Sequence, residues 1–427
     1  MSAPSVSRRL PLLTLLTANA VSNVGNMLTM VAIPWFVLQT TGSASKTGIV
    51  AALTALPTII AGIFGGTIVD RTGFKRMSVL ADIASGGAVA LIPLLDRTIG
   101  IHFWELMLLV FLGALFDAPG STARQSLLPD LAEPAGMPLE RANAAYTGIQ
   151  RASMLLGPPL AGVLIALFSA SNVLLIDAAT FAFSAVAIVA IIPSPARQAA
   201  NEDGSERYLT QLGESFRFVL GDRLIFTMLI IVALVNFITA PLFDVIFPVY
   251  ARQIYGSALD LGIMMAAFGI GAVIGTLAYG AIGHRVSRRL TFVSAFLLSM
   301  IPAWVLVMTP RLAITIAALV VIGIASGPIN PLLMTVFQER TPANMRGRLF
   351  GMITAIAWVA MPVGMLAAGL LIEYGSLRMT LGLIAGALAF TTLGVLVNPT
   401  LRALDKPRTG SDSDADRQTI AEIETAD

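Results

Sequence analysis

Long apolar runs, separated by short polar breaks, dominate the chain. Twelve such runs lie near residues 12–38, 48–69, 77–95, 103–123, 143–168, 172–193, 224–250, 259–282, 291–309, 312–336, 349–371 and 376–398. Each has about the length that a helix needs to cross a bilayer, roughly 20 residues. The first run is too long for the apolar part of a signal peptide, so we interpret it as an uncleaved span. The pattern predicts an all-α polytopic membrane protein with twelve transmembrane helices in two six-helix, pseudo-symmetric bundles.

Polar stretches divide the chain into four predicted parts. Residues 1–193 form an N-terminal six-helix bundle, 194–223 a linker, 224–398 a C-terminal six-helix bundle and 399–427 a tail. Within the linker, residues 208–220 place apolar side chains at helical spacing with charges opposite, which predicts an amphipathic helix along the inner membrane surface. The tail is rich in Ser, Asp and Glu, which predicts a disordered cytoplasmic segment.

Composition supports the membrane interpretation. The chain is 56% hydrophobic and 12% charged, with a mean hydropathy of +0.82, whereas soluble domains have about 25% charged residues. The net charge of +2 and the pI near 9.1 come from bases beside the spans, so they indicate orientation and imply no nucleic acid. No cysteine is present, which excludes disulfides and thiolate metal sites. We expect no metal and no cofactor.

Basic residues are distributed unevenly between the two sets of loops. If the N-terminus is cytoplasmic, the inner side holds Arg8, Arg9, Arg71, Lys75, Arg76, Arg124, Arg141, Arg285, Arg288, Arg289, Arg340, Arg346 and Arg348. The outer side then holds only Lys46, Arg97, Arg252, Arg311 and Arg378. Positive charge favours the cytoplasmic side, so this asymmetry predicts a multi-pass protein of the cell membrane, in a bacterium the inner membrane, with both termini cytoplasmic.

The loop between the second and third spans carries a motif of glycines and charges. It consists of Gly66, Asp70, Arg71, Gly73, Lys75 and Arg76. This order resembles the motif G-x-x-x-D-R-x-G-x-(R/K)-(R/K) of the major facilitator superfamily. The resemblance implies a gating role: Asp70 would meet the positive N-terminal end of the eleventh span, near Arg346 and Arg348, when the inner side closes. The alternative is an ordinary basic loop capping two helices.

Glycines and charges recur at about half the chain length. Gly280 and Arg285 stand 214 residues after Gly66 and Arg71, and Gly364 and Gly369 stand 207 residues after Gly157 and Gly162. Such recurrence indicates two parallel repeats related by an axis along the membrane normal.

The fifth span contains a second motif, with Ala144, Ser153, Gly157, Pro158, Ala161 and Gly162. It resembles the antiporter motif of the same superfamily, with small residues in place of three glycines. Small residues let another helix pack closely, and Pro158 removes a backbone donor. The wider pattern is most similar to the branch with macrolide-efflux and enterobactin-export proteins. A proline-bent packing helix in a transporter of either direction is the alternative.

These resemblances imply a secondary active transporter that exports amphipathic small molecules, drug-like or siderophore-like, by proton antiport with alternating access. The implied partners are a small amphipathic substrate, protons and membrane lipids, and we expect a monomer. A proton-linked importer and a lipid-like-molecule flippase are the alternatives. The sequence contains no H-E-x-x-H, G-x-S-x-G or phosphate-loop motif, so we expect no enzymatic activity and no direct ATP drive.

Ionisable residues inside lipid are costly, which makes them functional candidates. Asp117 in the fourth span and Arg151 in the fifth fall at similar depth, which predicts either a proton-coupling pair or a permanent structural pair. Asp177, Asp244 and Glu373 lie toward the outer ends of their spans and are further coupling candidates. Asp82 is assigned to the loop charges at the inner end.

Other polar and aromatic positions are candidates for the substrate cavity. The first span carries Asn19, Asn23 and Asn26 where many drug–proton antiporters have an acid, and asparagine does not titrate. The Arg-x-x-Gln-Gly signature of the fourth span is also missing. Trp358, predicted to lie in the middle of the eleventh span, offers an aromatic surface to a flat substrate, or packs against helices or lipid.

Overall fold

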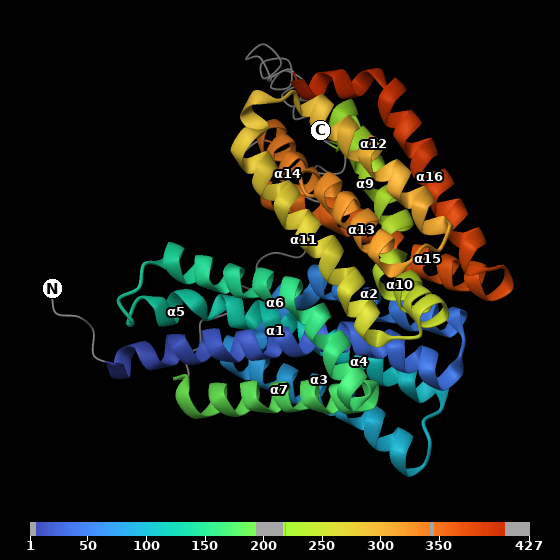
Figure 1. The fold of residues 1–427 in the computed structure, drawn as a ribbon. Coiled ribbons are helices and arrows are strands. Elements are labelled where there is room, and N and C mark those ends of the chain that lie inside the picture. The colour runs from blue at the N-terminus through green and yellow to red at the C-terminus, as the bar shows by residue number, and fades with distance from the viewer. Residues whose placement is uncertain (1–5, 194–216, 218, 342–345, 406–427) are drawn as a thin grey trace.

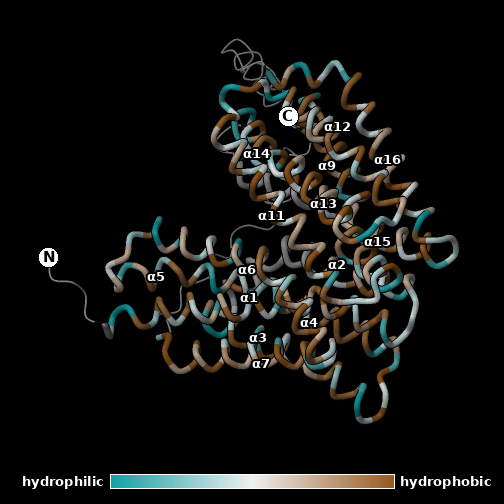
Figure 2. Tube along the Cα trace, viewed as in Figure 1, coloured by the Kyte–Doolittle hydropathy of each residue, from teal (hydrophilic) through white to brown (hydrophobic). Residues whose placement is uncertain are grey.

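The computed structural model describes residues 6–193, 217, 219–341 and 346–405. Hydrophobic residues predominate along the helices, and many hydrophilic residues lie near the helix ends and connections (Figure 2). Eleven helices of the described part are long and apolar enough to cross a membrane. Together with α2, whose apolar stretch ends in Asp70 and Arg71, they make the twelve spans that the hydropathy pattern predicts.

Helices α1 to α7 form the N-terminal bundle. They are α1 (Val6–Thr41), α2 (Ala44–Thr72), α3 (Phe74–Thr98), α4 (Phe103–Ser126), the short α5 (Leu128–Ala132), α6 (Leu139–Phe168) and α7 (Ala170–Ile191). Turns between them occur where the sequence permits a left-handed backbone, as at Gly73, which has φ +87° between α2 and α3.

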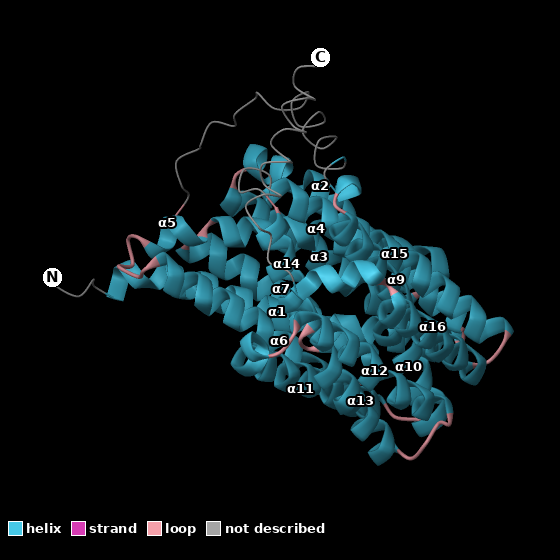
Figure 3. Cartoon of the chain, turned by 90° about the horizontal axis from the view of Figure 1, so that it is seen from above, coloured by secondary structure: helices cyan, strands magenta, loops and turns pink. Residues whose placement is uncertain are grey.

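The second bundle repeats this plan with more interruptions. It contains α9 (Arg223–Pro241), η1 (Leu242–Ile246), α10 (Phe247–Tyr250), η2 (Ala251–Tyr255), α11 (Ala258–Ile282), η3 (Gly283–Arg285), α12 (Arg288–Val307), α13 (Leu312–Ser326), α14 (Ile329–Arg340), α15 (Arg346–Tyr374), α16 (Leu377–Val397) and η4 (Pro399–Asp405). All described elements are helical (Figure 3).

Two predicted spans are less regular than the hydropathy pattern indicates. The seventh continues to Tyr255 through two π-helical segments, η1 and η2, and η1 follows Pro241. The tenth is broken between α13 and α14 at Gly327 and Pro328, since proline removes a backbone donor and glycine weakens the helix. Hydropathy cannot register these breaks because both spans stay apolar throughout.

The predicted boundary of the disordered tail at residue 399 is wrong. Residues Pro399–Asp405 form η4, a 3-10 helix, in which Leu401 and Leu404 are buried against the C-terminal bundle. Asp405 also accepts a hydrogen bond from Ser287 Oγ at the start of α12. Two apolar side chains therefore tie this segment to the bundle. The amphipathic helix predicted for residues 208–220 and the rest of the tail fall almost entirely outside the described residues.

Each bundle has two ends, which we call the basic end, after its Arg and Lys residues, and the far end. The basic end carries the starts of α1, α3, α6 and α12 and the end of α14, with Arg8, Arg9, Lys75, Arg76, Arg141, Arg288 and Arg340. The far end carries the connections at residues 42–43, 99–102, 169, 256–257, 308–311 and 375–376.

In the described part of the chain, the buried core joins the two bundles at the far end. One apolar cluster there joins both bundles, from Leu28 and Ala44 to Leu261 and Ala368. Toward the basic end the core separates into a cluster within the N-terminal bundle and a cluster within the C-terminal bundle. Accordingly, the bundles converge where α2, α10 and α15 meet and diverge toward the N-terminus of α1 and the end of α14 (Figure 1). The structure is closed at the far end.

Candidate functional site

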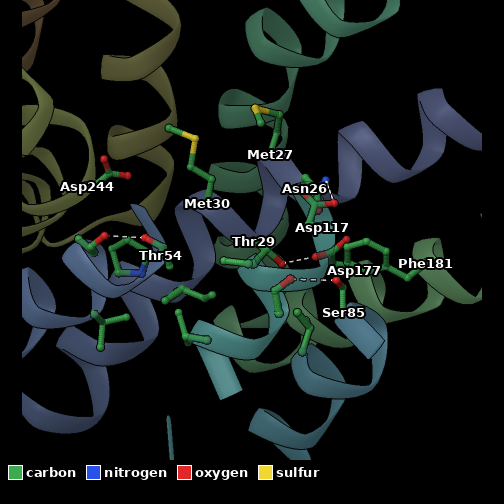
Figure 4. Close-up of a pocket in the computed structure, with 18 residues that line it drawn as sticks. Asn26, Met27, Thr29, Met30, Thr54, Ser85, Asp117, Asp177, Phe181 and Asp244 are labelled. Atoms are coloured by element: carbon green, nitrogen blue, oxygen red, sulfur yellow. Dashed lines mark hydrogen bonds between the residues drawn. The ribbon is translucent and has the colours of Figure 1, made fainter. Parts of the chain in front are cut away.

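A cavity of about 250 Å³ lies where the N-terminal bundle faces the C-terminal one. Apolar side chains of α1, α2, α3, α4 and α7, among them Met27, Met30, Ile33, Val50 and Phe181, make most of its wall. Three carboxylates interrupt this wall: Asp117 from α4, Asp177 from α7 and Asp244 from η1. Asp244 lies on the opposite side of the cavity from Asp117 and Asp177 (Figure 4). Thus three predicted coupling residues, from distant parts of the sequence, line one cavity.

Asp117 is the partly open member of the three. Its side chain is 33% exposed, and its Oδ1 accepts a hydrogen bond of 3.0 Å from Asn26 Nδ2 of α1. The guanidinium of Arg124, two turns further along α4, approaches the same oxygen at 4.0 Å. The carboxylate of Asp117 therefore faces the cavity, and it contacts a neutral donor, Asn26, and a cation, Arg124.

The predicted pairing of Asp117 with Arg151 is not present in this structure. Arg151 lies exposed on α6 and makes no ion pair among the described residues. Equal depth in the membrane favours the pair, but depth does not determine the direction in which a helix presents a side chain. The cation beside Asp117 is Arg124, which lies on the same helix.

Arg124 also makes the strongest buried ion pair of the N-terminal bundle. Its Nη1 lies 2.7 Å from Asp82 Oδ1 of α3, and both side chains are 1% exposed. Ser184 Oγ of α7 donates to the other oxygen of Asp82 at 2.6 Å. The assignment of Asp82 to the loop charges is therefore wrong: Asp82 and Arg124 form a buried link from the cavity toward the basic end.

The sequence gives only a weak signal for this network. Arg124 falls at the end of an apolar run, where a base is usually a loop charge. Asp82 follows the loop motif by six residues and is separated from Arg124 by 42. A fully buried base at that depth requires a buried acid, but only the packing of α3 against α4 identifies which acid it is.

Asp177 is completely buried on α7. The hydroxyl of Thr29 on α1 donates to Oδ2, and the hydroxyl of Thr180 donates to Oδ1 at 3.0 Å. The sequence places Asp177 toward the outer end, within reach of water, but α1 covers it. Two hydroxyl donors stabilise a carboxylate in such a position.

Asp244 differs from the other two acids because it has no hydrogen bond or ion pair to a described residue. It belongs to the π-helical segment η1, and it is the cavity residue contributed by the C-terminal bundle. Figure 4 places it across from Met30 and Thr54. Its carboxylate is thus free to contact a molecule in the cavity, and π-helical segments often occur at functional sites.

Among the other predicted cavity residues, only Asn26 lines the cavity. Asn19 is 1% exposed inside the N-terminal bundle, and its amide has no hydrogen-bond partner among the described residues. Asn23 and Trp358 are likewise not part of the cavity wall, and Trp358 is 41% exposed. In this conformation the aromatic side chain of the wall is Phe181.

The motif of the fifth span lies at contacts between helices. A side chain at Gly157 would collide with Met27 of α1, and a Cβ at Gly162 would lie 2.8 Å from Ala258 O at the start of α11. Ser153, Pro158 and Ala161 are buried. The small residues therefore permit close packing on two sides of α6, which is the physical interpretation of the motif.

The loop motif is only partly described. Lys75 Nζ donates to the carbonyl oxygens of Val189 and Ile192, at 3.1 and 2.5 Å, and so caps the end of α7. Gly73 makes the turn, and Arg76 is exposed at the basic end. The structure does not describe the side-chain surroundings of Gly66, Asp70, Arg71, Arg346 and Arg348. The predicted contact of Asp70 with the eleventh span therefore stays a prediction.

Chemically, the cavity suits an amphipathic cation or a proton. Carboxylates in an apolar wall attract positive charge, and methionine side chains adapt to varied apolar shapes. No group of three His, Cys, Asp or Glu residues in the described ranges is placed to hold a metal ion.

The sequence profile of the Major Facilitator Superfamily matches residues 15–259 and 229–423. The Multidrug efflux pump Tap of Mycobacterium tuberculosis is 34% identical over 402 residues, covering 93% of this chain and 96% of Tap. Macrolide efflux protein A of Streptococcus pyogenes is 22% identical over 368 residues, covering 85% and 89%.

Solved structures show the same fold at low sequence identity. A point mutant of the nucleoside transporter NupG has a TM-score of 0.75 at 13% identity and covers 90% of this chain and 99% of its own. A bacterial homologue of the human lysosomal transporter Spinster, in an inward-facing and unoccupied conformation, has a TM-score of 0.74 at 14% identity, with coverages of 95% and 99%.

Proposed function

This chain belongs to the major facilitator superfamily, and from that premise we propose that it is an efflux pump that expels amphipathic, positively charged small molecules in exchange for protons. The observation that carries the proposal is the position of Asp117, Asp177 and Asp244 around one apolar cavity between the bundles. Membership of this superfamily supports a transporter, and the relatives include proteins named for multidrug and macrolide efflux.

The cavity wall supports a preference for cations. A drug-sized cation in this cavity would lie against Met27, Met30 and Phe181 while its charge meets a carboxylate. An anion would meet Asp117 and Asp244 and no base among the described wall residues. Burying an unpaired charge is unfavourable, so the wall discriminates by charge and tolerates variation in apolar shape.

Proton exchange follows from competition for the same carboxylates. A proton or a substrate cation can neutralise an acid in the cavity, and burial disfavours the state in which neither is bound. We assign the exchange to Asp117 because it is partly open to the cavity and because Arg124 stands behind it. When Asp117 is neutral, Arg124 keeps its charge partner in Asp82.

The conformation supports loading from the basic end. The bundles are packed together at the far end and diverge toward the basic end (Figure 1). If the basic end faces the cytoplasm, as its charges favour, this is the state that takes up substrate from inside the cell. Alternating access then requires the far end to open and the basic end to close, and we propose that Asp70 and the loop from Gly66 to Arg76 hold the closed basic end.

The experiment that tests this function is retention of a fluorescent amphipathic cation, such as ethidium, by cells that express the chain. We expect lower retention than in cells without it, and loss of this difference when a protonophore collapses the proton gradient. Equal retention of the cation in the two kinds of cell would contradict export, and a higher retention that depends on the chain would favour the importer.

A further inference from the structure

The bundles meet at the far end along two seams that the internal repeat relates. In the first seam α2 packs against α15, and Gly48 faces Gly369; in the second α6 packs against α11, and Gly162 faces Gly262. Gly262 stands 214 residues after Gly48, and Gly369 stands 207 residues after Gly162. The two seams are therefore made from equivalent positions of the two repeats.

The backbone geometry of the seams is also equivalent. A Cβ at Gly369 would lie 2.8 Å from Ala44 O, and a Cβ at Gly162 would lie 2.8 Å from Ala258 O. Ala44 and Ala258 are the first residues of α2 and α11. In each seam a glycine of one helix thus lies against the first turn of the partner helix: Gly369 of α15 against α2, and Gly162 of α6 against α11. The distance is the same in both seams.

Among the described residues, only the first seam has an acid of one bundle that bonds to the helix start of the other bundle; Asp260, the acid in the first turn of α11, belongs to that helix itself. Glu373, four residues after Gly369, accepts hydrogen bonds at Oε2 from Ala44 N–H at 2.8 Å, Ser45 N–H at 3.3 Å and the Ser43 hydroxyl at 3.1 Å. The residue four after Gly162 is Ala166, which is exposed and offers no such acceptor. Both helix starts also have a serine cap of their own, Ser43 for α2 and Ser257 for α11, so the bonds from Glu373 are what distinguishes the first seam.

A carboxylate at this position stabilises the closed far end. The first N–H groups of a helix have no partner within the helix and carry partial positive charge, so an acid there is favourable. Glu373 supplies this acid across the boundary between the bundles. The bonds therefore exist only while α2 and α15 touch, and they break when the far end opens.

Neighbouring charges are engaged elsewhere. The Lys46 ammonium lies over the Phe103 ring, 5.3 Å from its centroid, within the N-terminal bundle. Arg378 donates to Thr309 Oγ1 at 2.9 Å within the C-terminal bundle. In the described part of the chain, Glu373 thus acts on α2 alone. We propose that Glu373 is a one-sided latch that holds the far end closed across the α2–α15 seam, while the α6–α11 seam has no latch.

This inference goes beyond the proposed function, since it concerns the resting conformation whatever the substrate. It also differs from the expectation, drawn from the sequence, that Glu373 is a proton carrier. A latch changes the balance between open and closed states, whereas a carrier changes coupling.

The test measures the far-end distance in purified full-length protein without substrate. Because the chain has no cysteine, cysteines introduced at Ile99 and Met308, which are 75% and 77% exposed, can be spin-labelled specifically. We expect Glu373→Ala to raise the ratio of far-end-open to far-end-closed molecules about twofold to thirtyfold, as for loss of a helix cap.

Glu105→Ala is the matched control. Glu105 also lies at the far end and accepts a backbone N–H at a helix start, that of His102 at 2.8 Å, but within its own helix α4. Its removal should leave the distance distribution unchanged. An unchanged distribution in Glu373→Ala, or an equal shift in Glu105→Ala, would overturn the latch.

A second variant tests the mechanism by adding the missing acid to the other seam. Since Ala166 occupies the position equivalent to Glu373, Ala166→Glu should cap the start of α11 across the boundary. In the Glu373→Ala background we expect it to return the distance distribution toward that of the parent. A distribution that stays open would contradict a latch acting through helix capping. Because the readout is a distance and not transport, neither result depends on the proposed export.

Discussion

Arg124 shows how one buried side chain connects the cavity with the rest of the N-terminal bundle. Its guanidinium lies 2.7 Å from Asp82 and 4.0 Å from Asp117. It therefore stabilises both Asp82, which is buried from water, and Asp117, which is partly exposed to the cavity. Such a charge remains buried only with partners, because desolvating it alone costs several kcal/mol. The two acids therefore differ in position: Asp82 holds the arginine inside the bundle, and Asp117 faces the cavity.

Removal of this guanidinium should destabilise the fold. We expect Arg124→Met to lower the free energy of unfolding by about 3–5 kcal/mol, because it leaves Asp82 buried without its cation. Arg288→Met is the control, since the Arg288–Glu339 pair is 32% and 47% exposed and such pairs contribute about 1 kcal/mol or less. Denaturant unfolding of the detergent-solubilised protein measures the free energy of unfolding of both variants. Equal decreases would show that the buried pair contributes no more to stability than the exposed pair.

Neutralising the cavity acid should separate binding from coupling. Asp117→Asn keeps the size of the side chain and its contact with Asn26, but it carries no charge and takes up no proton. We expect the variant to bind ethidium and to stop concentrating it against a gradient. Asp130→Asn, in the exposed part of α5, should behave as the parent. A variant at Asp117 that still concentrates the dye would move the coupling to Asp244 or Asp177.

The sequence predicts the acids of the candidate site, but not their pairings or most of the cavity wall. An acid inside an apolar run is visible in the sequence, and this signal identifies Asp117, Asp177 and Asp244. Their surroundings depend on helix rotation: Thr29 covers Asp177, and Arg124 rather than Arg151 lies beside Asp117. Hydropathy reports the depth of a residue but not its direction, and for that reason it assigns Asn19 and Trp358 to a cavity that they do not line.

At the scale of elements, pairs of glycines decide where helices of different bundles touch. A Cβ at Gly162 would lie 2.8 Å from Ala258 O and 2.9 Å from Gly262 Cα, so only glycine allows α6 and α11 to approach so closely. The small residues of the fifth span indicate close packing from the sequence alone. The sequence does not show the partner, because the contact is made between the repeats and not within one.

A larger side chain in this seam should keep the far end from closing. We expect Gly162→Val to reduce transport at least tenfold and to increase the reaction of a membrane-impermeant thiol reagent with a cysteine introduced at Ala258, a buried residue of this seam. Gly386→Val is the matched control, since a Cβ at Gly386 meets no atom within 4 Å. Normal transport by Gly162→Val, at equal expression, would show that the seam tolerates separation.

The loop motif gives a prediction for the opposite end. If Asp70 holds the basic end closed against the start of α15, Asp70→Asn should reduce transport strongly while the protein remains in the membrane, because the closed state loses a charged contact with a helix N-terminus. Uptake assays normalised to protein amount in the membrane measure this. Full transport by the variant would remove the motif from the mechanism.

On the scale of the whole molecule, the sequence predicts the number of spans and their grouping well. Each apolar run is long enough to cross the bilayer, and the backbone must satisfy its hydrogen bonds within a helix there. Polar loops and the 207- and 214-residue offsets separate the bundles and relate them. The conformation is not predictable in this way, because hydropathy does not report which helices of the two bundles touch. The core that joins the bundles at the far end is visible only in the structure.

Uptake of ethidium by inverted membrane vesicles tests proton-driven export most directly, since the cytoplasmic face of the protein is then outside. When the vesicle lumen is made acidic, we expect the dye to accumulate inside, to leak out after addition of a protonophore, and to accumulate in vesicles with Asp130→Asn but not with Asp117→Asn. Accumulation that persists without a proton gradient, or loss of preloaded dye when the lumen is acidified, would contradict proton-coupled export by this chain.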